Sequence, residues 1–528
     1  MDGTEPGPEP GECVILDGAS LSLADLVAVA RHGACVRPDD EAAARVRESR
    51  AWIDEVSRGG ALTVYGVNTG FGSLAEVRIP PDDVATLTRN LILSHASGVG
   101  PPLPEEVVRA TILIRANTLA KGYSGIRLET LQTLIEMLNR GVHPVLPEKG
   151  SVGASGDLAP LSHLALTLIG EGEAMFQGRC LPGAEAMRQA GLAPVTLAAK
   201  EGLALNNGTS VTAALACLAL ADAENLVRHA EIALAISLEA VQAASRAFDA
   251  RLHAARNHPG QQASAAHVRR LIAGSQLIDS TQRVQDAYSL RCAPQVLGAV
   301  RDTLAFVRTT VEHEINAATD NPLIFLDEPS DNKAFSGGNF HGEPLALAMD
   351  YLGIAVAEIG SIAERRAFRL LDGALSGDLP AMLTPDGGLQ SGLMMAQYTA
   401  ASLVSDNKTL AHPDSVDSIP TGANQEDHVS MSANAARHAR EIVWNTERIV
   451  AAEMLCAAQA LDLRTEGSSR HPGDGTRAAY QALRDGGVAP LGQDRILAPD
   501  LERTAELIHS GQIARAVDLV LALKEDGG

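Results

Sequence analysis

The chain has 528 residues, of which 45% are hydrophobic and only 3% aromatic, and its formal net charge is −22. This length is enough for a large core and for more than one domain. The acidic balance argues against nucleic acid or an anionic membrane surface as a partner. With no secretory signal, and no apolar run that we expect to cross a bilayer, the sequence predicts a soluble, cytoplasmic protein.

Residues 1–12 are rich in Pro, Gly and Glu and predict a short disordered tail. The cysteines are scattered along the chain without a Cys-x-x-Cys pair. This spacing predicts reduced thiols, and neither a zinc site nor a disulfide framework. The six residues are Cys13, Cys35, Cys180, Cys217, Cys292 and Cys456.

Between residues 13 and 209, Gly and Pro interrupt the chain often. The frequent Gly and Pro residues predict an N-terminal domain of shorter helices and loops, with a candidate strand at 63–65. From Ser210 the apolar residues follow a helical period over long stretches. Long helices are predicted over residues 210–255, 295–318, 343–371, 392–410 and 429–463.

We therefore expect a central helical bundle over residues 210–473. Residues 474–528 predict a small cap whose last helix runs over about 501–523. Such long helices present more apolar surface than one monomer covers, which predicts a homo-oligomer.

The triplet Ala154-Ser155-Gly156 has the composition of a peptide that can react with itself. Attack of the Gly156 nitrogen on the carbonyl carbon of Ala154, with loss of two waters, gives a methylidene-imidazolone ring. One of these waters carries the Ser155 hydroxyl. Glycine suits the attacking position because no Cβ blocks the approach. The product is an electrophile, the electron sink that elimination of ammonia from an amino acid requires.

A helix is expected directly after the triplet. Asp157 is a favourable N-cap, Pro160 suits the first turn, and Gly170 ends the apolar stripe. The triplet then lies at a helix N-terminus, where free N–H groups and the dipole draw electron density. Taken alone, the triplet is more simply interpreted as a Gly-rich loop. It fits neither a phosphate-binding Walker loop nor a nucleophile elbow.

Further polar clusters lie in the segments between the predicted helices. Each one alone is simply a turn, a helix cap or an exposed helical face. Their joint occurrence with the triplet is what favours an active site. The clusters are 65–72, Ser94-His95, Asn206-Asn207, 285–291, Asn339-Phe340-His341 and 424–428.

The chain resembles the aromatic amino acid ammonia-lyases and aminomutases that carry a methylidene-imidazolone, and within them most the histidine ammonia-lyases. The resemblance runs from about Leu16 past Leu463. The phrases that carry it are Gly-Ser-Val-Gly-Ala-Ser-Gly-Asp-Leu-Ala-Pro-Leu (150–161), Tyr-Gly-Val-Asn-Thr-Gly-Phe-Gly (65–72), Tyr-Ser-Leu-Arg-Cys (288–292) and Ser-Val-Asp-Ser-Ile-Pro-Thr-Gly-Ala-Asn-Gln-Glu-Asp-His-Val-Ser-Met (415–431).

This resemblance implies a mainly α-helical fold with an N-terminal ring-bearing domain and a long central bundle. It implies a homotetramer whose active sites each draw on three subunits. The implied reaction converts L-histidine into urocanate and ammonia. The electrophile is formed by Ala154, Ser155 and Gly156, without a metal or an external cofactor.

The resemblance also implies roles for individual residues. Tyr65 is the base for the β-proton, Tyr288 relays a proton at the amine, and Glu426 is counted with the catalytic groups. Arg291 binds the substrate carboxylate. The other residues expected to bind substrate or support the ring are His95, Asn207, Gln285, Phe340 and Met394.

Substrate choice is expected to rest on His95 and Glu426, which together can hydrogen-bond both imidazole nitrogens. A lyase or 2,3-aminomutase for another aromatic amino acid is the alternative, since some tyrosine aminomutases share a His at position 95. Ser73, where a mutase carries Glu, favours the lyase. Asn206 and Tyr398 depart from the residues usual in the family. A non-catalytic helical assembly protein is the third interpretation, and the intact triplet, Tyr65 and Arg291 argue against it.

Overall fold

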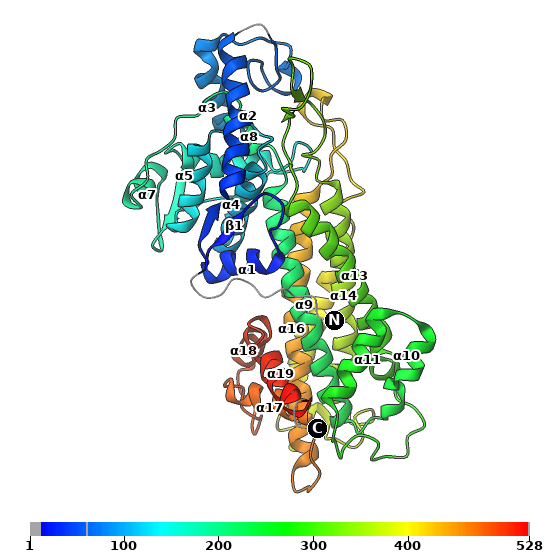
Figure 1. Cartoon of the computed structure of the whole chain (residues 1–528). Helices are drawn as coiled ribbons and strands as arrows, with labels where there is room; N and C mark the ends of the chain where they lie inside the picture. Colours follow the sequence, from blue (N-terminus) through cyan, green and yellow to red (C-terminus); the bar gives the residue numbers. More distant parts are fainter. Residues whose placement is uncertain (1–11, 60–61, 526–528) are drawn as a thin grey trace. The chain divides into compact units, whose positions relative to one another are not determined.

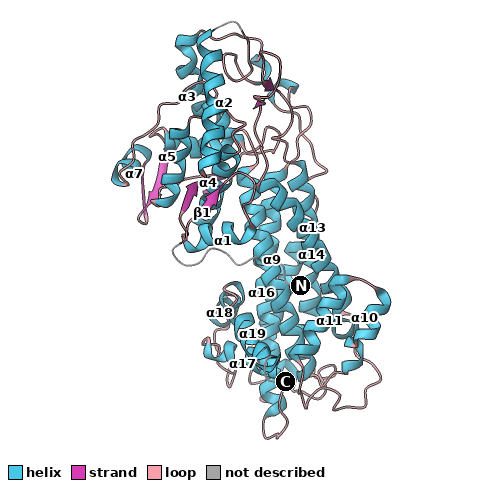
Figure 2. Ribbon diagram, viewed as in Figure 1, coloured by secondary structure: helices cyan, strands magenta, loops and turns pink. Residues whose placement is uncertain are grey.

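The computed structural model describes residues 12–59 and 62–525. The predicted disordered tail therefore lies outside the described residues apart from Glu12. Within the described ranges the protein is mainly α-helical, as predicted, with nineteen α-helices (Figure 1). Figure 2 shows that strands are few. Each strand in the described residues has two to four residues.

The described chain forms two compact units that alternate along the sequence. Unit 1 contains the residues up to Leu218 together with Arg308–Asp350 and Pro413–Arg437. Unit 2 contains Ala219–Val307, Tyr351–His412 and the residues from His438 onward. The predicted division at residues 209 and 473 follows sequence order and stays a prediction. Four of the five unit boundaries fall within long helices, and the fifth, between His412 and Pro413, lies in a loop. The four helices are α9 (Ser210–Ala240), α13 (Ala293–Ile315), α14 (Glu343–Leu371) and α16 (Ser432–Thr465).

Unit 1 is built around α4 (Glu105–Ala120), which is buried on all sides from Val107 to Ala120. Its apolar residues pack on every side, and its buried polar side chains, such as Arg109 and Arg115, donate to backbone carbonyls of neighbouring segments. The other helices of this unit are α1 (Leu23–His32), α2 (Asp40–Gly59), α3 (Val84–His95), α5 (Leu128–Asn139), α6 (Leu158–Leu168), α7 (Gly183–Gln189) and α8 (Glu201–Asn206).

The strands of unit 1 form small sheets between these helices. β1 (Val14–Leu16) pairs in parallel with β2 (Val36–Pro38), and the other ladders are antiparallel. The remaining strands are β3 (Val99–Pro102), β4 (His143–Pro144), β5 (Pro147–Lys149), β6 (Glu173–Phe176), β7 (Arg179–Pro182), β8 (Leu323–Ile324) and β9 (Ala334–Phe335). The predicted strand at 63–65 is wrong, because a turn begins at Tyr65.

In unit 2 the long helices lie side by side (Figure 1) and are joined by buried polar contacts. Glu453 of α16 accepts from Ser237 of α9 at 2.8 Å and from both Nε and Nη2 of Arg366 of α14 at 2.6 Å. Paired in this way, the buried charges avoid the cost of isolation. Smaller helices complete the unit: α10 (Ala250–Arg256), α11 (Pro259–Leu271), α12 (Tyr288–Arg291), α15 (Met394–Leu410), α17 (Asp474–Asp485), α18 (Ala498–His509) and α19 (Gln512–Glu525).

Three predicted helices have different bounds in the structure. The helix predicted over 210–255 ends at Ala240, because Gln242 adopts a left-handed φ of 55° and the Ala243 N–H returns to the Leu238 carbonyl at 2.9 Å. The helix predicted over 501–523 is two helices, interrupted at Gly511, whose φ is 69°. The helix predicted from 429 begins at Ser432.

Among the described residues, two helices are long and apolar enough to pass for membrane spans by length and composition. They are α9 and α14, with mean hydropathies of 1.4 and 1.6 over their most apolar stretches. Charged residues interrupt both helices, so neither is an uninterrupted apolar run. In the structure, 83% of that stretch of α9 and 61% of that of α14 is buried, as in core helices of soluble proteins.

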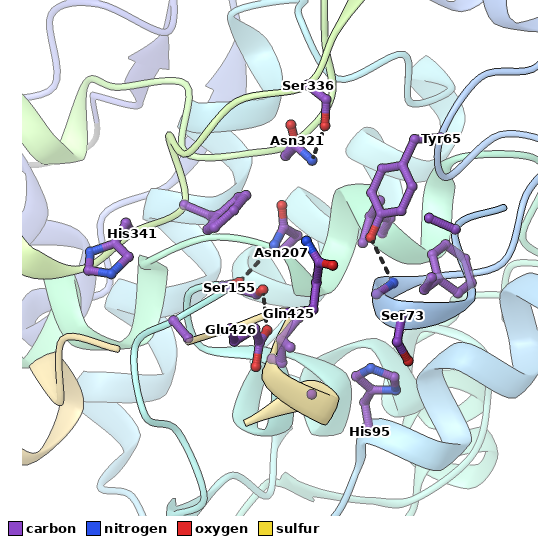
Figure 3. A pocket seen from close by; sticks show the side chains of 18 of the residues that line it. Tyr65, Ser73, His95, Ser155, Asn207, Asn321, Ser336, His341, Gln425 and Glu426 are labelled. Atoms are coloured by element: carbon purple, nitrogen blue, oxygen red, sulfur yellow. Dashed lines mark hydrogen bonds between the residues drawn. The ribbon is translucent and has the colours of Figure 1, made fainter. Parts of the chain in front are cut away.

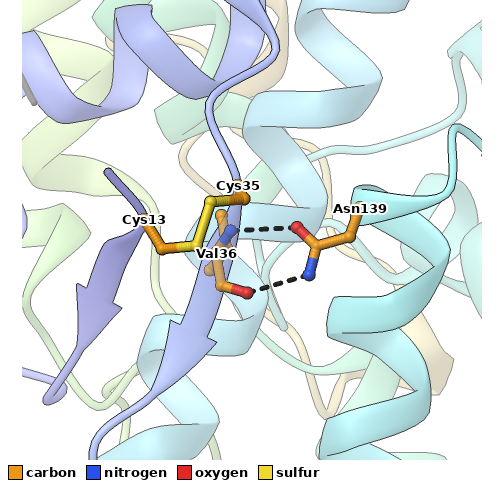
Figure 4. The surroundings of a disulfide bond; sticks show 4 residues. All are labelled: Cys13, Cys35, Val36 and Asn139. Atoms are coloured by element: carbon orange, nitrogen blue, oxygen red, sulfur yellow. Dashed lines mark hydrogen bonds between the residues drawn. A yellow bond between two sulfur atoms is a disulfide. The ribbon is translucent and has the colours of Figure 1, made fainter. Parts of the chain in front are cut away.

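The prediction of six reduced thiols is also wrong, since Cys13 and Cys35 form a disulfide (Figure 4). The pairing of β1 with β2 explains this bond. Val14 is opposite Val36, so Cys13 and Cys35, the residues directly before them, lie side by side. Asn139 holds β2 from the other side through both polar groups of Val36. Cys180, Cys217, Cys292 and Cys456 remain free.

Candidate active site

A cavity of about 740 Å³ lies in unit 1 and collects side chains from segments far apart in the sequence (Figure 3). Its walls come from the loop after Tyr65, the end of α3, the Ala154-Ser155 stretch, and the residue after α8. Two further segments complete it, the loops at 321–341 and the turn at 422–428. All of these lining residues belong to unit 1.

The triplet is held from both sides. Ala154 packs in a small buried cluster with Val429 and Met431. Gly156 has a left-handed φ of 73° and pairs in parallel with Gly208. A Cβ at position 156 would lie 2.2 Å from the Gly208 carbonyl oxygen, so packing as well as backbone angle requires glycine there.

The same contacts explain why α16 starts later than predicted. The Met431 N–H donates to the Val152 carbonyl at 2.9 Å, and the Ser430 hydroxyl donates to the Gly153 carbonyl at 3.0 Å. These residues are thus committed to the loop that carries the triplet. Met431 has a left-handed φ of 54°, which a residue inside an α-helix does not adopt, so the helix begins after it.

Asp157 occupies the predicted N-cap position of α6, but its side chain makes no cap hydrogen bond there. Its carboxylate instead accepts from the Thr212 N–H and hydroxyl, both at 2.8 Å, in the first turn of α9. The Ser151 hydroxyl donates to it as well, at 2.8 Å. Burial raises the pKa of the Asp157 carboxyl, and these hydrogen bonds act in the opposite direction. Asp157 therefore ties the triplet to the N-terminus of α9.

Ser155 is bound at both of its ends. Its hydroxyl donates to Glu426 Oε1 at 2.5 Å, and its carbonyl accepts from Asn207 Nδ2 at 2.7 Å (Figure 3). The other oxygen of Glu426 accepts from the Thr421 hydroxyl at 2.5 Å. The predicted residues Asn207 and Glu426 are thus both in contact with the triplet.

Tyr65 faces the cavity from the glycine-rich loop. Its hydroxyl oxygen accepts from the Gly72 N–H at 3.2 Å, and its ring meets Phe71 edge-on at a centroid distance of 6.4 Å. The hydroxyl hydrogen is therefore free to point toward a group in the cavity.

His95 is the last residue of α3 and lines the same cavity. The Ser94 hydroxyl donates to the Leu91 carbonyl at 3.1 Å, so its oxygen accepts from His95 Nδ1–H at 3.0 Å. Nε2 is then left as an acceptor. Burial lowers the pKa of His95, although the nearby charge of Glu426 acts in the opposite direction. The imidazole is therefore neutral at pH 7.

Four predicted site residues do not line this cavity. Gln285, Tyr288, Arg291 and Met394 all belong to unit 2, whereas Phe340 does line the cavity. Tyr288 is 72% exposed, and the Arg291 guanidinium lies 4.6 Å from its ring centre. Both residues belong to α12, which places their side chains against each other.

The charges of the cavity are unbalanced. Glu76, Glu426 and Asp427 line it, but no Lys or Arg does so among the described residues. Nor does the described part of the chain contain a group of three or more His, Cys, Asp or Glu placed to hold a metal ion. An anionic ligand in this cavity therefore needs a cation that the cavity itself does not supply.

A family profile described as aromatic amino acid lyase matches residues 21–485. The chain belongs to the aromatic amino acid lyase family. A histidine ammonia-lyase from Symbiobacterium thermophilum is 54% identical over 505 residues, which cover 95% of this chain and 98% of that relative.

Solved structures of this lyase family superpose over almost the whole chain. Histidine ammonia-lyase from Trypanosoma cruzi matches with a TM-score of 0.89 and 43% identity, covering 96% of both chains. Tyrosine aminomutase from Streptomyces globisporus matches with a TM-score of 0.90 and 40% identity, covering 96% of this chain and 99% of the other.

Sequence reasoning missed several cavity residues of this aromatic amino acid lyase. Asn321 donates to the Ser336 hydroxyl at 3.1 Å and accepts from the Gly337 N–H at 2.7 Å, and it lies in none of the polar clusters found in the sequence. His341 and His428 stack at a centroid distance of 5.7 Å. Their signal was present, because both lie inside motifs already singled out, directly beside Phe340 and Glu426.

Proposed function

We propose that the protein is a histidine ammonia-lyase, which converts L-histidine into urocanate and ammonia. The observation that carries this proposal is the presence of His95 and Glu426 in the cavity that holds Ser155. A neutral imidazole with a free Nε2 acceptor, facing a carboxylate, suits an imidazole substrate better than a phenyl ring. The 54% identical relative supports the same reaction.

We further propose that Ala154, Ser155 and Gly156 cyclise to a methylidene-imidazolone. The surroundings fit this group, because the close contact of Gly156 with Gly208 leaves no room for a Cβ and Asn207 holds the Ser155 carbonyl. The Ser155 hydroxyl, which must leave as water, is hydrogen-bonded to Glu426 Oε1. When formed, the ring supplies the electrophile that amine elimination requires.

The chain's own residues then have distinct tasks. Tyr65 is the proposed base for the β-proton of the substrate, which its oxygen takes up as the phenolate, and the Gly72 N–H donates to that oxygen. His95 and Glu426 orient the imidazole. Asn207 keeps the Ser155 carbonyl in place, and Phe340 forms part of the wall.

We propose a homotetramer in which Gln285, Tyr288, Arg291 and Met394 reach the cavity from neighbouring subunits. The cavity has no Lys or Arg of its own, so the substrate carboxylate needs a guanidinium from elsewhere. The exposed apolar side chains of α14 to α16, such as Tyr351, Tyr398 and Trp444, suit burial between subunits. We place the enzyme in the cytoplasm, without nucleic acid or membrane as a partner.

Incubation with single aromatic amino acids tests the reaction. We expect urocanate absorbance from histidine, and neither cinnamate from phenylalanine nor coumarate from tyrosine. Intact-mass analysis of the wild type is expected to show a deficit of two waters that is absent in Ser155→Ala. A wild type of full mass that is active, or one that ignores histidine, contradicts the proposal.

A tyrosine or histidine 2,3-aminomutase is the second candidate, favoured by the similarity to the Streptomyces aminomutase. The two reactions differ in whether ammonia returns to Cβ. Chromatography of the products distinguishes them, because a mutase yields a β-amino acid and little free ammonia.

A further inference from the structure

Helix α8 is short and depends on contacts with the rest of unit 1 for its stability. It has only six residues, Glu201–Asn206, all of them buried, and the next residue is Asn207. A single turn and a half of helix is unstable without tertiary contacts. Because Asn207 binds the Ser155 carbonyl, the position of α8 decides the position of this amide.

The N-terminal end of α8 is fixed by a buried ion pair. Lys200 Nζ lies 2.8 Å from Asp320 Oδ2, and both side chains are fully buried. The other oxygen of Asp320 accepts from the Asn321 N–H at 2.7 Å, and Asn321 lines the cavity. The adjacent Glu201 accepts from Arg127 and Thr130. This end of the helix is thus joined to the cavity wall.

The C-terminal end is fixed by Arg115 of α4, which is fully buried. Its Nε donates to the Ala204 carbonyl at 2.9 Å, and its Nη2 donates to the same oxygen. The last carbonyls of a helix have no partner within it, so this contact satisfies one of them. Burial lowers the pKa of Arg115, and the negative charge of Asp320 opposes this shift.

The third nitrogen of Arg115 reaches the backbone beneath the triplet. Nη1 has no hydrogen-bond partner among the described residues. A Cβ on Gly208 would lie 2.4 Å from Nη1 and 2.3 Å from the Thr319 carbonyl oxygen. The other face of Gly208 lies against Gly156, with which it pairs. Gly208 is therefore packed between Arg115 on one side and Gly156 on the other.

We propose that Arg115 is a positioning residue for the ring-forming triplet, acting through the Ala204 carbonyl on Asn207 and through Gly208 on Gly156. This proposal rests on the proposed function, since it concerns the ring at residues 154–156. Arg115 touches neither the cavity nor the substrate. It holds two backbone segments at the spacing that cyclisation requires.

Helix α4 offers a matched control six residues away. Arg109 is also buried, and its guanidinium donates to the Val29 carbonyl at 3.0 Å and 2.8 Å and to the Leu138 carbonyl at 3.3 Å. Its guanidinium also lies 3.0 Å from His143 Nε2, so its partners lie on α1, α5 and β4, and none of them lines the cavity. Replacing either arginine removes similar bonds from the same helix, but only Arg115 adjoins the triplet.

The test compares Arg115→Lys with Arg109→Lys in the full chain. Each lysine keeps the charge but cannot make both bonds of the guanidinium fork. We expect intact-mass analysis of R115K to show less than half of the chains with the two-water deficit, against nearly all in R109K and wild type. In the matured fraction kcat should fall at least tenfold with KM for histidine changed less than twofold. Thermal unfolding midpoints should fall to a similar extent in the two variants.

Complete maturation of R115K, with kcat within twofold of the wild type, overturns the proposal. If R115K is not recovered folded, Arg115→Gln gives the same comparison with a shorter donor. Loss of folding in both Arg115 variants, but not in R109K, also overturns it, because the role is then structural alone. A wild type without the two-water deficit refutes the proposed function instead, which separates the two failures.

Discussion

Under the proposed function, His95 is the single side chain on which we expect substrate choice to depend most. Its Nδ1–H is engaged by Ser94, which leaves Nε2 to accept from a substrate N–H. Replacing it with leucine leaves the polar edge of a buried substrate unpaired, which costs about 1–3 kcal/mol, or roughly five- to 150-fold in rate. We therefore expect His95→Leu to lose activity on histidine by about this factor in kcat/KM.

Steady-state kinetics on histidine and on phenylalanine measure this effect. The exposed His32 provides a control, because His32→Leu lies away from the cavity and should leave kcat/KM unchanged. Wild-type kinetics of H95L on histidine would falsify the assignment of the substrate.

At this scale the sequence predicted residue types better than residue contacts. Tyr65, His95, Ser155, Asn207, Phe340 and Glu426 all line the cavity, and each stands in a motif that a reader of the sequence can find. The side chain of Asp157 was misplaced, because its carboxylate caps α9, a helix that begins more than fifty residues later. Such a long-range partner leaves no signal in local spacing.

Among the elements, the β1–β2 pair carries a disulfide that links residues 22 apart. Closing a loop of this length is worth about 3 kcal/mol by restricting the unfolded chain. We expect oxidised protein to unfold at a higher temperature than reduced protein or Cys35→Ser. Thiol titration of unfolded, unreduced protein should find four thiols. Six thiols, or a midpoint that ignores reductant, would show that the bridge does not form in solution.

Helices α9 and α19 meet at a buried histidine whose titration affects stability. His229 Nδ1–H donates to the Asn225 carbonyl at 2.8 Å, so Nε2 accepts from the Ala514 N–H at 3.3 Å. Burial lowers the pKa of His229 to about 4, with smaller and opposing effects from neighbouring charges. The unfolded pKa is about 6.5, so the unfolded chain binds the extra proton.

The difference between these two pKa values makes the free energy of unfolding depend on pH. His229 contributes its full stability above pH 6.5, and this contribution, up to about 3 kcal/mol, is lost as the pH falls toward 4. We expect unfolding midpoints of His229→Gln to be lower at pH 7 but to depend less on pH between 6.5 and 4. Parallel pH profiles for H229Q and the wild type would contradict this assignment.

Element boundaries could be predicted only where the stop signal is local. α14 has the predicted bounds, 343–371, and α15 begins two residues later than expected. The end of α9 at Ala240 was missed because the left-handed residue that follows is a glutamine, where glycine is the usual signal. The start of α16 was missed because residues 430 and 431 bind the distant triplet loop.

For the whole molecule, the decisive question is whether one chain makes a complete active site. Among the described residues, the cavity of unit 1 is lined by Tyr65 but by no Lys or Arg, whereas Arg291 belongs to unit 2 and does not line it. The proposed homotetramer resolves this imbalance with a carboxylate-binding guanidinium from a neighbouring subunit. A site shared between subunits predicts that mixed oligomers behave differently from oligomers in which each site is built by one chain.

Co-expression of two inactive variants, Tyr65→Phe and Arg291→Ala, tests this shared site. In mixed tetramers some cavities pair an intact Tyr65 with an intact Arg291 from another chain, so activity should reappear. The matched control mixes Tyr65→Phe with Asn207→Ala. Both of these lesions concern residues that line the same cavity of unit 1, so a cavity with both residues intact never arises on mixing and activity should stay absent. Absence of recovery for the first pair, in tetramers that native mass spectrometry shows to be mixed, rejects the shared site, because a site built within one chain carries a lesion in every copy.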